Sequence, residues 1–136
     1  MHFKFLIKMF NFLNKFFGGN ILYYPGCLTK FAAPQLKEKY EKILRKAGID
    51  FIELGELEVC CGSPALKAGY VDDFKKLAQK NLKIFKDHGV KKIITNCPAC
   101  FMILKKEYSK VLGKEWNIEI EHISQTIANK IRNSKF

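Results

Sequence analysis

Short apolar runs alternate with amphipathic stretches from residue 20 onward, and this alternation constrains the fold more than any other feature. The apolar runs are 21–24, 51–54, 92–95 and 118–123, and the amphipathic stretches are 34–47, 72–87, 99–112 and 124–131, the last with Ser124 as its expected N-cap. Strands that alternate with helices form a parallel sheet, because each crossover helix returns the chain to the same end of the sheet. The sequence therefore predicts an α/β fold with a four-stranded parallel sheet flanked by helices.

Five cysteines follow the carboxyl ends of the first three predicted strands. They are Cys27, the adjacent pair Cys60 and Cys61, and Cys97 and Cys100 with two residues between them. Because the carboxyl ends of parallel strands meet at one edge of a sheet, we expect the three groups to converge on a single site. An odd number of cysteines cannot pair completely as disulfides within one chain. Soft thiolate ligands in this number indicate a metal or iron–sulfur centre.

Three chemistries compete for these thiols. A structural zinc ion takes four thiolates and leaves one cysteine over. A thiol–disulfide exchanger of the glutaredoxin type uses Cys97 and Cys100 alone, which leaves the other three cysteines without a role. An iron–sulfur centre can use all five, provided that it is not a simple cubane with four ligands. The spacing favours a metal or a cluster over thiol exchange.

Each cysteine group is expected to lie in a tight turn rich in free backbone amides. Cys97-Pro98-Ala99-Cys100 opens a predicted helix, whose N-terminus stabilises thiolate. Gly26 precedes Cys27 and Gly62 follows Cys61, and a residue without a side chain lets the backbone approach a bulky centre. Such turns are suited to an anionic cluster.

The segments around the cysteines carry a resemblance to a known family. They are Tyr24-Pro25-Gly26-Cys27, Glu58-Val59-Cys60-Cys61-Gly62, Ala68-Gly69-Tyr70, Thr95-Asn96-Cys97-Pro98-Ala99-Cys100 and His122-Ile123-Ser124. The chain resembles, over residues 20–131, the cysteine-rich CCG domain found in heterodisulfide reductase. Similar domains occur in the iron–sulfur subunits of glycolate, lactate and glycerol-3-phosphate oxidising enzymes.

This resemblance implies a Rossmann-like domain over residues 20–136 and a noncubane [4Fe-4S] cluster held by Cys27, Cys60, Cys61, Cys97 and Cys100. It implies an electron-transfer or disulfide-reducing component of a heterodisulfide-reductase-like or flavoprotein oxidoreductase complex, with a ferredoxin-like or flavoprotein partner subunit. Family members usually carry two such domains and this sequence shows one, so we expect a second CCG domain or a homodimer to complete the pair. The alternatives are a zinc-bound structural or interaction module and a thiol–disulfide oxidoreductase that uses Cys97 and Cys100.

The charge of the chain and its distribution indicate which kinds of partner to expect. The formal net charge is +11, yet only two of the 24 basic residues are arginines, and the lysines are spread along the predicted helices. This pattern is typical of a solvated surface, with an acidic partner protein as the next interpretation, and no nucleic acid is expected. The cysteine usage favours a reducing, cytoplasmic location.

Residues 1–19 are predicted to form a separate amphipathic helix, with lysines along a narrow polar stripe. The segment is too short and too charged to span a bilayer. Two interpretations stay open: the helix packs on this domain or on a partner subunit, or residues 1–17 make a peripheral membrane contact.

Other polar residues near the predicted edge receive no catalytic assignment. His122 ends the fourth predicted strand and is interpreted as structural. Lys67 and Tyr70 follow the adjacent cysteines and are given no role. Glu53, Glu56 and Glu58 are expected to be solvated loop residues rather than general bases. No glycine-rich nucleotide fingerprint follows a strand, so no bound dinucleotide is expected.

Overall fold

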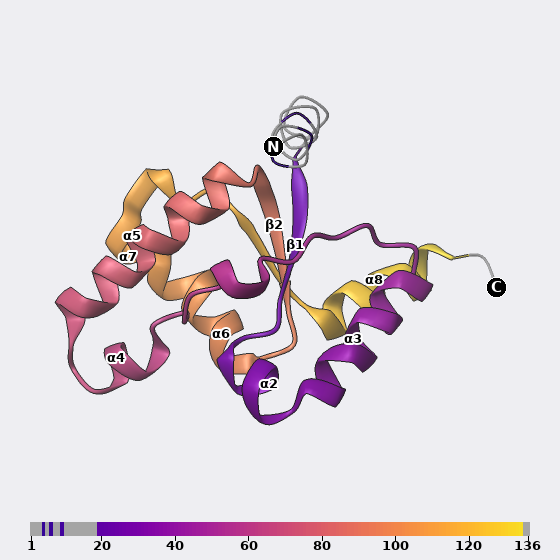
Figure 1. The fold of residues 1–136 in the computed structure, drawn as a ribbon, viewed down its shortest axis with the longest axis horizontal. Helices are drawn as coiled ribbons and strands as arrows, with labels where there is room; N and C mark the ends of the chain where they lie inside the picture. The colour runs from indigo at the N-terminus through magenta and orange to yellow at the C-terminus, as the bar shows by residue number, and fades with distance from the viewer. Residues whose placement is uncertain (1–3, 5, 7–8, 10–18, 135–136) are drawn as a thin grey trace.

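The computed structural model describes Lys4, Leu6, Met9 and residues 19–134, and residues 19–134 form a parallel sheet flanked by helices (Figure 1). The strands are hydrogen-bonded in the order β1 (Asn20–Tyr24), β2 (Val90–Thr95) and β3 (Glu119–His122), and both pairs are parallel. The helices are α2 (Cys27–Ala32), α3 (Pro34–Lys46), α4 (Ser63–Lys67), α5 (Val71–Asp87), α6 (Pro98–Met102), α7 (Tyr108–Leu112) and α8 (Ile123–Asn133), with shorter turns η1 (Gly55–Leu57), η2 (Ile103–Glu107) and η3 (Gly113–Glu115). The predicted α/β class is confirmed.

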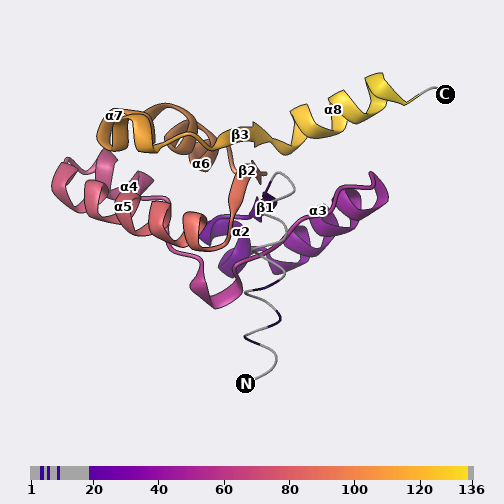
Figure 2. The same ribbon diagram turned by 90° about the horizontal axis from the view of Figure 1, so that it is seen from above.

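Helices cover both faces of the sheet. Seen from above, α5 and α7 lie on one side of the strands, and α3 and α8 lie on the other (Figure 2). Leu22 and Ile93 face the first pair of helices, whereas Tyr23 and Ile94 face the second pair. Both alternating sets are buried, which explains the continuous apolar runs 22–24 in β1 and 93–94 in β2.

The sheet has three strands rather than the four predicted, because residues 51–54 make a single bridge. The Ile52 amide donates to the Ile21 carbonyl (2.8 Å), and the Tyr23 amide donates to the Ile52 carbonyl (3.0 Å). Leu54 already has helical backbone angles, and Gly55 begins the turn η1. The extended run therefore ends before a ladder can form, although it lies beside β1 where the fourth strand was expected.

The helix predicted over 99–112 contains a π-helical turn. This turn, η2, separates α6 from α7, and the Trp116 indole N–H donates to the Leu104 carbonyl within it (2.9 Å). A π-turn inserts one residue into the helical register, so it redirects the side chains that follow. Tyr108, the first residue of α7, is fully buried against Phe74 and Trp116. The two short helices α2 and α4 were not expected from the hydrophobic pattern.

His122, and not Ser124, is the N-cap of α8. The His122 ring Nδ1 accepts from the Ser124 amide (3.2 Å), and the Gln125 side chain accepts from the His122 amide (3.1 Å). His122 is still paired with β2, so the helix begins at the next residue and leaves Ser124 inside its first turn.

His122→Ala is expected to lower the free energy of unfolding by about 1–2 kcal/mol, because it removes this cap and a hydrogen bond to the Asn96 carbonyl. Ser124→Ala leaves the cap in place and removes an exposed hydroxyl that lies 2.8 Å from the His122 ring Nδ1, so it is expected to cost roughly 0.5 kcal/mol or less. Urea denaturation of both variants measures the difference. Equal losses would contradict the assignment of the cap to His122.

The predicted amphipathic helix of residues 1–19 lies almost wholly outside the described residues, so it stays a prediction. Among the residues that the structure does describe, no helix is both long and apolar enough to cross a membrane.

Candidate iron–sulfur site

The three cysteine groups converge at the carboxyl end of the sheet. Cys27 is the first residue of α2, Cys60 and Cys61 precede α4, and Cys97 and Cys100 lie at the start of α6. Their thiols interact in a series: Cys27 with Cys60, Cys60 with Cys61, Cys61 with Cys100, and Cys100 with Cys97. The convergence expected from the sequence is therefore present.

Burial is greatest in the middle of this series. Cys61 and Cys100 are each 4% exposed, and their sulfurs lie 3.5 Å apart. Cys60 and Cys97 are partly buried, and Cys27 is exposed. The middle of the series, Cys61 and Cys100, is therefore shielded from water, and its Cys27 end at α2 faces solvent.

The buried pair holds a single negative charge most easily. The Cys100 thiol donates to the Cys61 sulfur, and this contact lowers the pKa of Cys61 to about 6. The same contact, together with burial, raises the pKa of Cys100. Burial also raises the pKa of Cys60.

Among the described residues, no group of three or more His, Cys, Asp or Glu side chains has an arrangement that could hold a metal ion. The thiols interact pairwise, in a row whose middle, Cys61 and Cys100, is buried and whose two ends are more exposed.

Gly26 leaves the space in which the first and third cysteine groups meet. Its φ is +81°, and a Cβ at this position would lie 2.9 Å from the Cys100 sulfur and 3.6 Å from the Cys97 Cβ. The donor set is five thiols, and the backbone around it lacks the side chain that would obstruct it. The residues present therefore fit a polynuclear thiolate-bound group.

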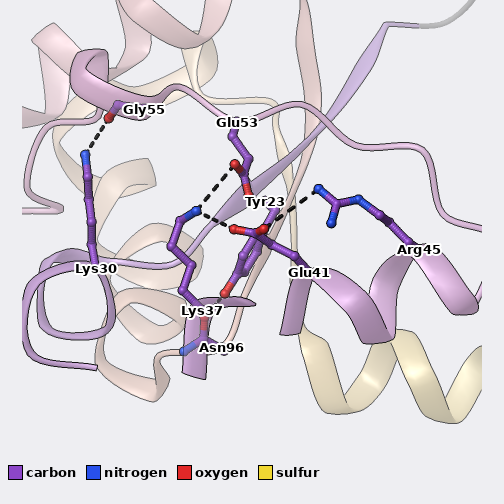
Figure 3. Close-up of polar contacts among 8 residues, drawn as sticks. All are labelled: Tyr23, Lys30, Lys37, Glu41, Arg45, Glu53, Gly55 and Asn96. Atoms are coloured by element: carbon purple, nitrogen blue, oxygen red, sulfur yellow. Dashed lines mark hydrogen bonds and ion pairs between the residues drawn. The ribbon is translucent and has the colours of Figure 1, made fainter. Parts of the chain in front are cut away.

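Asn96 connects the loop of Cys97 to the helix of Cys27. The Asn96 side-chain nitrogen donates to the Thr29 hydroxyl (2.9 Å). The Asn96 side-chain oxygen accepts from the Tyr23 hydroxyl (2.7 Å; Figure 3). His122 accepts at Nδ1 from the Ser124 amide, so its Nε2–H donates to the Asn96 carbonyl (3.2 Å). These contacts agree with the structural role predicted for His122.

Lysines attach α2 and α3 to the segment that leads to the adjacent cysteines (Figure 3). Lys30 donates to the Gly55 carbonyl (2.5 Å). Lys37 forms an ion pair with Glu41 on its own helix, and a second one with Glu53 (3.4 Å), in the segment that precedes η1. The Cys27 helix is thereby held beside the approach to Cys60.

The other acidic and polar candidates have different environments. Glu53 and Glu56 are exposed, but Glu58 is half-buried, and burial raises its pKa to about 7. Glu58 is therefore not the solvated residue that its acidic neighbours suggested. Lys67 and Tyr70 are exposed.

Sequence reasoning missed Asn81 and Tyr108, which are fully buried behind the adjacent cysteines. Asn81 interrupts the apolar face of α5, since Phe74, Ala78 and Phe85 occupy the neighbouring positions of the same face. A polar residue at a helical core position was the signal that could have identified it.

Comparison with known proteins agrees with this geometry. The pattern of the cysteine-rich domain family, CCG, matches residues 21–105. The chain is 36% identical over 119 residues to a dihydromethanophenazine:CoB–CoM heterodisulfide reductase subunit from Methanosarcina barkeri, a match that covers 85% of this chain and 29% of that protein. It is 35% identical to the EtfAB:quinone oxidoreductase of Syntrophomonas wolfei (84% of this chain, 16% of that protein) and 31% identical to a fumarate reductase (CoM/CoB) subunit from Methanothermobacter marburgensis (87% and 23%).

The chain spans less than a third of the length of each of these relatives. No solved structure gives a significant match. The family pattern covers more than half of the chain and includes all five cysteines, and the chain therefore belongs to the cysteine-rich CCG domain family.

Proposed function

We propose that this protein binds an iron–sulfur cluster through Cys27, Cys60, Cys61, Cys97 and Cys100 and acts as the electron-transfer or disulfide-reducing component of an oxidoreductase complex. The observation that carries the proposal is the row of five interacting thiols at one edge of the sheet. Membership of a family whose members include oxidoreductase subunits supports it.

A bound cluster would supply one-electron chemistry at this edge. The protein's part is to fix the five sulfurs, to exclude water from Cys61 and Cys100, and to leave Cys27 accessible. The Gly62 amide donates to the Cys60 sulfur (3.4 Å), and such bonds stabilise negative charge on sulfur. Electrons would exchange with a partner most readily at the exposed end, near α2.

We also propose a cluster type, the bounds of the cluster-binding domain, its partners and its location. Five thiols favour a noncubane [4Fe-4S] cluster, because a cubane uses four. The cluster-binding domain comprises residues 20–136, and its partner is a ferredoxin-like or flavoprotein subunit. A second CCG domain or a homodimer completes the pair, residues 1–17 provide a helix for a subunit or membrane contact, and the location is cytoplasmic.

Anaerobic purification with assays for iron, acid-labile sulfide and zinc tests the cluster. We expect about four iron and four sulfide per chain. Each of the five single Cys→Ser variants is expected to weaken iron binding about tenfold or more, because even changes around the ligands weaken metal binding by roughly 10–100-fold.

Each alternative gives a different result. Near-stoichiometric zinc without sulfide would overturn the cluster assignment. One silent Cys→Ser variant among the five would indicate a four-ligand cubane. A metal-free protein that reduces disulfides, and loses this activity only on substitution of Cys97 or Cys100, would favour thiol exchange.

A further inference from the structure

Three successive backbone carbonyls around the adjacent cysteines accept hydrogen bonds from buried side chains. Tyr24 Oη donates to the Val59 carbonyl (2.5 Å), Asn81 Nδ2 to the Cys60 carbonyl (3.0 Å), and Tyr108 Oη to the Cys61 carbonyl (2.8 Å). The donors come from β1, α5 and α7, so three separate elements converge on one stretch of backbone.

Asn81 and Tyr108 form one connected unit. Asn81 Nδ2 also donates to the Tyr108 hydroxyl (2.9 Å), which in turn donates to the Cys61 carbonyl. Both side chains are 0% exposed. Tyr108 is further fixed by ring contacts with Phe74 and Trp116, at centroid distances of 5.7 and 4.9 Å.

These bonds determine which way the peptide groups face. The described residues contain no cis peptide bond, and in a trans peptide the carbonyl and the following N–H point in opposite directions. With the Cys61 carbonyl turned toward Tyr108, the Gly62 amide faces the sulfurs and donates to Cys60 Sγ (3.4 Å). The pKa of the Cys61 thiol is lowered by its contact with Cys100, and the backbone amides of Ser63 and of Cys61 itself lower it further.

Asn81 would lower the stability of the fold if packing were its only role. Its side-chain oxygen is buried and has no hydrogen-bond partner among the described residues. An unpaired buried acceptor costs free energy that a leucine of similar size would avoid. The two donor bonds of its nitrogen are what the asparagine provides and a leucine cannot.

We infer that Asn81 and Tyr108, assisted by Tyr24, are positioning residues that turn the peptides of the Cys60–Cys61 loop so that their amides face the cluster-binding sulfurs. This inference rests on the proposed function. It assigns to the buried core of α5 and α7 a part in holding the thiolates and in tuning the charge that they carry.

Asn81→Leu and Tyr108→Phe test the inference in the full chain. Thr126→Val is the matched control, because it removes a buried hydroxyl that donates to the His122 carbonyl, outside this loop. In cluster-free reduced protein, at a fixed pH below the pKa values of both thiols, iodoacetamide should alkylate Cys60 and Cys61 about tenfold more slowly in both variants, because fewer amides then stabilise the thiolate that reacts. Mass spectrometry should show unchanged rates at Cys27 and Cys97, and the control should match the wild type throughout.

The reduction potential of the reconstituted protein provides the second measurement. Fewer amides facing the sulfurs should weaken binding of the added electron about tenfold, which corresponds to a potential about 59 mV more negative for one electron. The double variant should fall short of the sum of the single effects, because the two side chains form one unit.

Two results would overturn the inference: unchanged or faster alkylation at Cys60 and Cys61 in a folded variant, or an equal change at all five cysteines. If Asn81→Leu does not fold, Tyr108→Phe gives the same test. If the wild-type protein binds no iron, the proposed function fails, whereas the alkylation rates still decide whether these residues position the loop.

Discussion

Replacement of Gly26 by alanine is expected to remove most of the iron-binding capacity of the protein without unfolding it. The new Cβ would lie 2.9 Å from the Cys100 sulfur, closer than side chains approach in folded proteins. Cys100 is buried, so either its sulfur or the turn that carries Cys27 must shift, and both changes separate the first and third cysteine groups. We expect iron per chain after anaerobic reconstitution to fall about tenfold, a loss typical of displaced metal ligands.

Gly48→Ala separates this effect from backbone strain. Gly48 also has a positive φ, +75°, but nothing lies within 4 Å of a Cβ built on it. Gly48→Ala should lose about 1–2 kcal/mol of stability from its positive φ. Gly26→Ala should lose about 1–3 kcal/mol, because φ 81° and ψ 160° are angles that few residues besides glycine adopt. Only Gly26→Ala should lose iron. Wild-type iron content in Gly26→Ala would show that the first and third cysteine groups do not share one site.

The fold was predictable where local pattern alone decides the structure. The apolar runs of β1 and β2 are buried on both faces, so their composition identifies them as strands of a covered parallel sheet, whereas β3 is identified by its alternation of apolar and polar residues. The run 51–54 has the same composition, yet the backbone turns at Leu54 and Gly55 after one bridge. That ending depends on backbone angles, which hydrophobic pattern does not encode. Ser124 was expected as a cap for its residue type, but the length of β3 places His122 there instead.

The convergence of the cysteines was predictable from the sequence, and the residues that support them were not. The cysteines follow strand ends, so topology brings them together whatever the details of packing. Asn81 and Tyr108 reach the same place only because α5 packs against α7, and the π-turn η2 sets the register of Tyr108. Glu58 is adjacent to exposed acidic residues in sequence but is half-buried in the fold. Contacts between distant elements create these environments, and single-sequence periodicity contains no information about them.

Gly62→Ala is expected to be among the most destabilising single substitutions in the cysteine-bearing loops. Gly62 has φ +93°, and a Cβ would lie 2.7 Å from Cδ2 of Phe74, a ring that is 1% exposed in the core. Left-handed strain contributes about 1–2 kcal/mol and overpacking about 1–3 kcal/mol, so the free energy of unfolding should fall by roughly 2–5 kcal/mol. Chemical denaturation measures this loss. The same shift should disturb Cys61, which directly precedes the glycine.

Gly69→Ala and a second substitution at Phe74 isolate the steric part. Gly69 has φ +88° with nothing within 4 Å of a Cβ, so Gly69→Ala should lose only the backbone strain of about 1–2 kcal/mol. In Gly62→Ala/Phe74→Leu the ring is gone and the clash is relieved. The double variant should therefore be more stable than the sum of its single losses, by about 1–3 kcal/mol. Strict additivity would mean that the Phe74 ring does not press on this turn, and that the adjacent cysteines are held by the backbone of the loop and not by the packing of α5.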